Sequence, residues 1–194
     1  RKTDTSFENK VFDVAAAKEW WYGNFIKSEK YRTINTESYF APPLLLGAKA
    51  TKKYPYWKRG ISYGKGGLKI VELPLYYSNP VSVFPGSSDL PESERRRIAR
   101  ATLQKLLLIK NSSGNISLRI AMFIPTPEYA RIKKYDMSGN SLNKPVSDFS
   151  GWLVVKEWDE TIRTWWELDK GVVKRKIRLA EKSSSGAYRT ESEI

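Results

Sequence analysis

Five carboxylates in the C-terminal part of the sequence could do acid–base chemistry. Glu157, Asp159, Glu160, Glu167 and Asp169 lie in a stretch that also holds four of the seven tryptophans. Two facing carboxyl groups are enough to hydrolyse a glycosidic bond, and aromatic rings favour sugar binding. The competing interpretation is that these carboxylates balance neighbouring Lys and Arg side chains, as surface carboxylates commonly do. We favour this second interpretation and keep a carboxylate glycosidase as an alternative.

The composition excludes several other chemistries. The sequence has no cysteine and no histidine, so it cannot supply a thiol nucleophile, a thiolate metal site or a Ser-His arrangement. The run at residues 136–140 resembles the start of a calcium loop but lacks the remaining ligands. We therefore predict no cofactor and no metal, and we favour a non-enzymatic function.

A cluster of aromatic and basic residues is a candidate ligand-binding site. Tyr54, Tyr56, Trp57, Lys58 and Arg59 follow one another closely in the sequence. Aromatic faces can stack on bases or sugar rings while the cations meet phosphate or carboxylate groups. Burial of Trp57 in the core, with solvated charges around it, is the alternative that we favour.

A second candidate binding site lies on the last expected strand, residues 172–179. Lys174, Lys176 and Arg178 alternate there and should project from one face, whereas Val173 should point to the apolar face. The formal net charge of +13 suits a polyanionic partner, namely nucleic acid, acidic polysaccharide or anionic lipid headgroups. A plain solvated sheet surface explains the same pattern.

The tryptophan-rich stretch predicts a three-stranded antiparallel meander, which would position the carboxylates and the basic strand. Residues 152–158 alternate with apolar groups on both faces, as in a buried strand. A second strand is expected at 162–168, a tight turn at 169–171 and a third strand at 172–179.

The rest of the chain predicts one helix and further strands. Asp13 is a good N-cap for a helix over residues 14–26, whose apolar stripe favours packing on a sheet over binding a partner. A helical or irregular segment from residue 92 should lead into a hairpin, and Pro74 indicates a sheet edge or a bulge. Strands are expected at 68–77, 101–110 and 116–124.

Several motifs resemble a family of uncharacterised exported proteins of the Bacteroidetes, many of them lipoproteins. The resemblance covers residues 17 to about 179 and includes AKEWW at 17–21, YPYWKRG at 54–60, VELPL at 71–75 and SGWLVVKEWDETI at 150–162. It also includes the stretch LLLIKNSSGNISLRIAMFIPTPEY at 106–129. These motifs are structural and transfer no catalytic residue. The resemblance implies a secreted or cell-envelope location.

The sequence as a whole predicts a single α+β domain over residues 1–182, followed by a polar tail or linker at 183–194. An N-terminal helix should pack on a curved, mainly antiparallel sheet of five to seven strands. The leading functional hypothesis is a binding module for an anionic or carbohydrate ligand, or for a protein partner. A cytoplasmic nucleic-acid-binding protein is the first alternative. No apolar run is long enough for a transmembrane segment.

Overall fold

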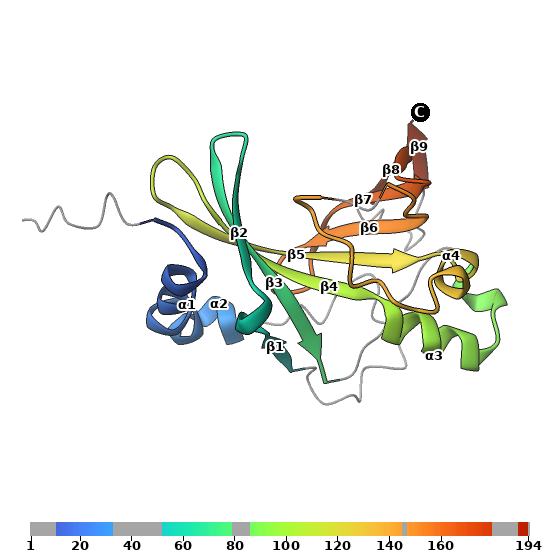
Figure 1. Cartoon of the computed structure of the whole chain (residues 1–194), viewed down its shortest axis with the longest axis horizontal. Helices are drawn as coiled ribbons and strands as arrows, with labels where there is room; N and C mark the ends of the chain where they lie inside the picture. The colour runs from blue at the N-terminus through green and yellow to red at the C-terminus, as the bar shows by residue number, and fades with distance from the viewer. Residues whose placement is uncertain (1–10, 33–51, 79–85, 145–146, 180–189, 194) are drawn as a thin grey trace, which may run out of the picture.

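An antiparallel sheet with helices at both ends makes up the computed structural model, which describes residues 11–32, 52–78, 86–144, 147–179 and 190–193 (Figure 1). The helices of this part of the chain are α1 (Val14–Gly23), η2 (Phe25–Lys27), α2 (Glu29–Arg32), η4 (Trp57–Arg59), η5 (Ser87–Asp89), α3 (Glu92–Ala101) and α4 (Pro127–Ile132). The strands are β1 (Lys53–Pro55), β2 (Ile61–Lys65), β3 (Leu68–Tyr77), β4 (Leu103–Lys110), β5 (Ile116–Pro125), β6 (Gly151–Lys156), β7 (Ile162–Asp169), β8 (Val172–Leu179) and β9 (Thr190–Glu193).

The described strands form a nine-stranded sheet in the order β1-β3-β4-β5-β6-β7-β8-β9, with β2 also paired to β3. The α+β class, the antiparallel sheet and the N-terminal helix packed on it are as predicted. The strand count exceeds the five to seven that were expected. The strands that were not expected are β1, which pairs with β3, and β9. Strand β9 pairs with β8 and lies in the stretch expected to be a polar tail.

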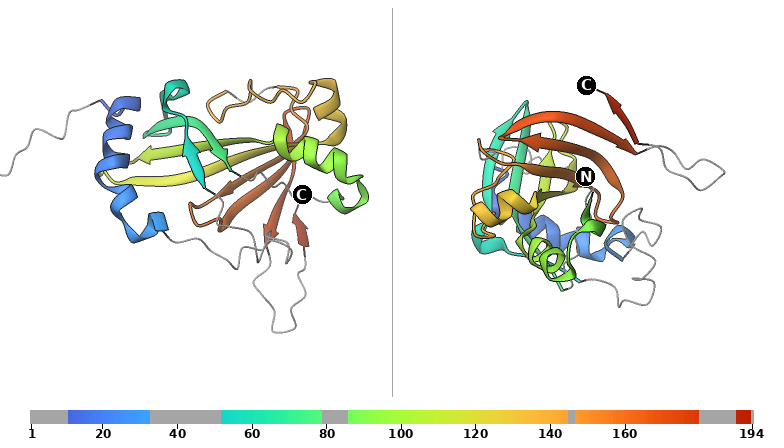
Figure 2. Two further views of the ribbon diagram at one scale, coloured as in Figure 1. Left: turned by 90° about the horizontal axis from the view of Figure 1, so that it is seen from below. Right: turned by 90° about the vertical axis from the view of Figure 1, so that its right-hand side faces the viewer.

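The sheet curls strongly. Four strand spacings separate β1 from β6, which is about 19 Å in a flat sheet. Lys53 on β1 nevertheless contacts Trp158 and Glu160, in the turn between β6 and β7. The sheet therefore bends until its first strand approaches this turn, and the fan of curved strands is visible from two sides in Figure 2.

Apolar side chains on both faces of the sheet explain its two cores. The larger core lies on the concave side, where Val71, Leu73 and Trp152 pack with Trp21 and other residues of α1. The smaller core lies on the opposite face and includes Phe123 and Phe149. This arrangement confirms that the alternating residues of β6 are apolar in both directions.

The N-terminal helix begins where its sequence predicts, but it ends at Gly23 and not at residue 26. The Asp13 side chain accepts a hydrogen bond from the Ala16 amide at 2.9 Å, which caps the free N–H groups of the first turn. Ala17, Trp21 and Phe25 are buried in the concave core, so the apolar stripe serves packing. Among the described helices, none is long and apolar enough to cross a membrane.

Pro74 lies inside a strand that has neighbours on both sides. Lys105 of β4 is its partner on one side. On the other side β1 ends opposite Leu75 and β2 begins opposite Glu72. Pro74 therefore lies in the gap between two edge strands, where its missing N–H interrupts no continuous ladder.

Candidate functional site

The aromatic and basic cluster is divided between the two faces of β1. Side chains of a strand alternate, so Tyr54 and Tyr56 share one face while Lys53 takes the other. Trp57 begins η4 and packs on the concave core, with its ring 6.0 Å from that of Trp21. Trp57 therefore packs against the core and is half-buried, in the direction that we favoured, whereas the two tyrosines stay at the surface.

Three tyrosines form an exposed aromatic platform. Tyr54 and Tyr76 are partners across β1 and β3, and the Tyr56 ring lies 5.9 Å from the Tyr76 ring. Their exposed fractions are 52%, 54% and 38% for Tyr54, Tyr76 and Tyr56. Sequence reasoning missed Tyr76, because its place beside Tyr54 depends on the strand register. We call Tyr54, Tyr56 and Tyr76 the tyrosine platform.

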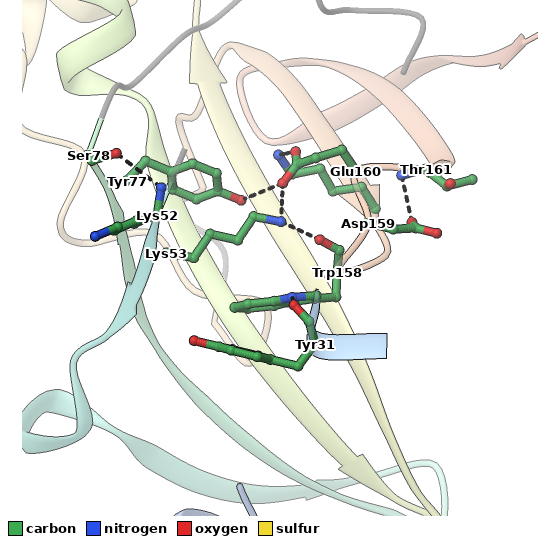
Figure 3. A network of polar contacts seen from close by, with 10 residues as sticks. Tyr31, Lys52, Lys53, Tyr77, Ser78, Trp158, Asp159, Glu160 and Thr161 are labelled. Atoms are coloured by element: carbon green, nitrogen blue, oxygen red, sulfur yellow. Dashed lines mark hydrogen bonds and ion pairs between the residues drawn. The ribbon is translucent and has the colours of Figure 1, made fainter. Parts of the chain in front are cut away.

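Cations border the tyrosine platform. Lys52, Lys58 and Arg59 are all exposed, and Lys52 points away from Lys53 (Figure 3). Residues 52–71 contain six Lys and Arg residues and no Asp or Glu. The platform can therefore offer ring faces and positive charge to the same ligand.

A buried ion cluster lies on the other face of β1 (Figure 3). Lys53 and Lys156 both form ion pairs with the Glu160 carboxylate, and the Tyr77 hydroxyl donates to it at 3.2 Å. Lys53 also donates to the Trp158 carbonyl. We call Lys53, Lys156, Glu160 and Tyr77 the ion cluster. It joins the first strand of the sheet to the β6–β7 turn.

Burial and mutual attraction set the pKa values in the ion cluster. Burial lowers the pKa of both lysines, and the neighbouring Glu160 only partly offsets this. Burial alone would raise the pKa of Glu160, but Lys156 and Lys53 together hold it below its ordinary value of 4.5. Burial and the Glu160 charge raise the pKa of Tyr77 well above 10. The carboxylate is thus stabilised in its ionised form.

Aromatic rings line the ion cluster. The Lys53 ammonium lies 4.5 Å from the centre of the Trp158 ring, and Tyr31 stacks on that ring at 5.6 Å. The Trp158 indole N–H donates to the Tyr31 carbonyl at 3.1 Å. These contacts hold α2 against the β6–β7 turn, so this cluster has a clear structural role.

The carboxylates proposed for glycosidase chemistry are all engaged. Glu157 accepts from Arg119 at 2.7 Å and from Arg163 at 2.8 Å, one on each oxygen. The others are engaged as follows: Glu160 with two lysines, Glu167 with Arg175, Asp169 with Lys174 and Asp159 with the Thr161 amide. A general acid needs a raised pKa, and the pKa of Glu160 is lowered. These observations favour charge balance over catalysis.

The basic strand β8 presents its cations to solvent. Lys174 and Lys176 are exposed, whereas the side chain of Arg178 lies outside the described residues. Val173 was expected to face the core but is 55% exposed. The reason is a register shift at Glu167 and Leu168, which leaves Lys174 without a partner on β7 and breaks the alternation.

Two further basic runs, residues 95–97 in α3 and 131–134 at the end of α4, lie at the end of the sheet opposite α1 (Figure 1). Glu94 of α3 accepts from Arg131 of α4 at 3.1 Å and from the Tyr135 hydroxyl at the same distance. Arg97 lies 4.1 Å from the Tyr135 ring centre. Because acidic residues are interspersed with these cations, their positive charge is partly balanced locally.

The loop that resembles a calcium site is an ordinary turn. Asp136 accepts the Ser138 amide at 2.9 Å, and hydrogen bonding from Ser138 lowers the pKa of Asp136. Among the residues that the structure describes, no three acidic side chains gather as a metal site would require.

The fold and the surface define an α+β protein with a curled antiparallel sheet and an aromatic, basic platform at one edge. Comparison with protein-family models, curated protein sequences and solved structures finds no match to this chain.

Proposed function

We propose that this protein is a non-enzymatic binding module that holds an anionic carbohydrate on the tyrosine platform. The observation that carries the proposal is the joint exposure of Tyr54, Tyr56 and Tyr76 beside Lys52, Lys58 and Arg59. Tyrosine offers a rigid apolar ring with a polar hydroxyl, which suits the C–H faces and hydroxyl groups of a sugar. The cations meet its carboxylate or sulfate groups. A secreted or envelope location belongs to this proposal through the resemblance alone.

Single-stranded nucleic acid is the second candidate ligand, because the same combination of aromatic platform and cations binds stacked bases and phosphates. Both ligands are polyanions whose rings would stack on the platform, so both should bind more weakly at higher salt and keep part of their affinity. The relative affinity for the two at one salt concentration therefore distinguishes them.

The first experiment measures binding of heparin, neutral dextran and a thymidine oligonucleotide by titration over a salt series. We expect heparin to bind more tightly than either of the others at physiological salt. The Lys58→Ala/Arg59→Ala and Tyr54→Ala/Tyr76→Ala variants should each weaken heparin binding at least about tenfold, which is about 1.4 kcal/mol.

The Lys174→Ala/Lys176→Ala variant is the matched control, since it removes two exposed cations from β8. It should change heparin binding far less than the Lys58→Ala/Arg59→Ala variant. Equal losses in both variants would show a diffuse charge effect and would contradict a site at the platform. Tighter binding of the oligonucleotide would favour the nucleic-acid candidate.

A further inference from the structure

Strand β2 is an open edge of the sheet. Over residues 61–65 it pairs with β3, and no other strand of the described chain pairs with it. Four of its five residues are exposed, and the β2–β3 hairpin projects beyond the sheet in Figure 1. An edge strand with unpaired backbone groups can template the addition of another strand.

The hairpin is ordered in a way that keeps this edge available. Gly66 and Gly67 both have positive φ, 56° and 77°, as a two-residue turn of type I′ requires. The Tyr63 hydroxyl donates to Glu72 at 3.0 Å and holds the register against β3. Glu72 is fully buried and also accepts from Ser141 at 3.0 Å. The edge is thus preformed and needs little further ordering.

The register decides which backbone groups face outward. The two-residue turn makes Lys65 and Leu68 a pair whose backbone groups are hydrogen-bonded to each other. Hydrogen-bonded and non-hydrogen-bonded pairs alternate along an antiparallel ladder. Ser62 and Gly64 therefore direct their N–H and C=O groups away from β3. Glycine at position 64 also permits a close approach by another backbone.

Two of the features that usually prevent an edge strand from pairing, proline and a bulge, are missing from β2. It has no proline, and its ladder with β3 runs without a register shift from residue 61 to residue 65. Lys65 stands at its end and not at its centre. Ile61 is 44% exposed and offers an apolar contact beside the open backbone groups.

Charge selects the kind of strand that could be added. Five of the six cations in residues 52–71 are exposed and the segment has no acidic residue, so a second copy of this segment would be repelled. An extended segment whose acidic side chains lie on the same face as Lys65 would complement the charge at the end of this strand.

We propose that β2 accepts an extended acidic segment of a partner protein as an added strand. This interaction goes beyond the binding of a carbohydrate, because it uses the backbone of β2 and not the rings of the tyrosine platform. Main-chain hydrogen bonds supply the affinity in this recognition mode, and alternate side chains supply the selectivity.

The test titrates the protein with an acetylated and amidated hexapeptide of alternating Glu and Val, followed by two-dimensional NMR of the backbone amides. We expect a dissociation constant below about 1 mM and slower hydrogen exchange at the Ser62 and Gly64 amides. The same peptide with N-methyl groups on alternate residues should bind at least about tenfold more weakly, since it lacks half of the donors.

Two variants complete the test. Ser62→Pro removes the outward N–H without touching the bonds to β3 and should abolish peptide binding, while Ser62→Ala keeps the donor and should bind normally. Lys58→Ala/Arg59→Ala, which tests the carbohydrate site, should leave the protection of Ser62 and Gly64 in place. Absence of binding at 1 mM, equal binding of the N-methylated peptide, or unchanged exchange at both amides would overturn the proposal.

Discussion

At the scale of single residues, the Glu160 carboxylate connects several buried polar groups on the concave side of the sheet. It forms ion pairs with two buried lysines and accepts a hydrogen bond from Tyr77. Removing one partner of a buried ion pair leaves an uncompensated charge in a region of low polarity. Glu160 also has a φ of 74°, so the turn places this side chain at the cost of some backbone strain.

We predict that Glu160→Gln lowers the free energy of unfolding by about 3–5 kcal/mol at pH 7, measured by urea denaturation. Glu92→Gln is the control, because it breaks an exposed pair with Arg96 and should cost less than about 1 kcal/mol. Similar losses in the two variants would mean that the ion cluster contributes no more than a surface pair.

The same substitution should change the dependence of stability on pH. The pKa of Glu160 is lowered by folding, so its contribution is fully present above pH 4.5 and is lost as the pH falls through the folded-state pKa. The difference in unfolding free energy between the wild type and Glu160→Gln should therefore shrink below pH 4.5. A difference that stays constant down to pH 2 would contradict the assigned charge state.

At the scale of elements, glycine is required where β6 begins. A Cβ atom on Gly151 would lie 2.1 Å from the Ile124 carbonyl oxygen and 2.8 Å from the Phe149 ring. By contrast, a Cβ atom on Gly23 in α1 would meet nothing within 4 Å. These two glycines therefore allow opposite predictions for the same substitution.

We predict that Gly151→Ala lowers the unfolding free energy by at least about 1–3 kcal/mol, because the backbone of β5 must move away. Gly23→Ala should raise it by about 0.5–1 kcal/mol, since alanine favours the helix more than glycine does. Thermal unfolding followed by circular dichroism measures both changes. Destabilisation by Gly23→Ala would show that this helix end depends on glycine.

The regular elements of this fold follow from local sequence patterns, and the site does not. Period-two alternation predicts β6 to β8, and the Asp13 cap with its apolar stripe predicts α1. The three residues of β1 are too few to show a period. The pairing of β1 with β3 depends on the tertiary structure and not on a local pattern. Sequence reasoning therefore did not predict the place of Tyr76 beside Tyr54, or the ion pair between Lys53 and Glu160.

At the scale of the whole molecule, the contact between β1 and the β6–β7 turn holds the sheet in its curled form. Trp158 is buried there among Trp21, Phe25 and Tyr31. The indole therefore joins the N-terminal helices, the first strand and the C-terminal meander. A large loss of contacts at this point should affect segments that lie far apart in the sequence.

We predict that Trp158→Ala lowers the unfolding free energy by about 3–5 kcal/mol and speeds hydrogen exchange in α1, α2 and β1. Strands β4 and β5 should keep most of their protection, because they pair along their whole lengths. Tyr22→Ala is the control on the exposed side of α1. Uniform loss of protection over all strands would instead indicate a single cooperative unit.

The curled sheet has a consequence for how the chain reaches its native state. Lys53 and the Trp158 carbonyl lie 105 positions apart, and contacts between such distant residues form slowly. During synthesis the amino-terminal part leaves the ribosome first. The concave apolar surface therefore stays exposed to solvent until residues near 160 have been synthesised. We therefore expect that a chaperone which covers this apolar surface during synthesis would raise the yield of folded protein.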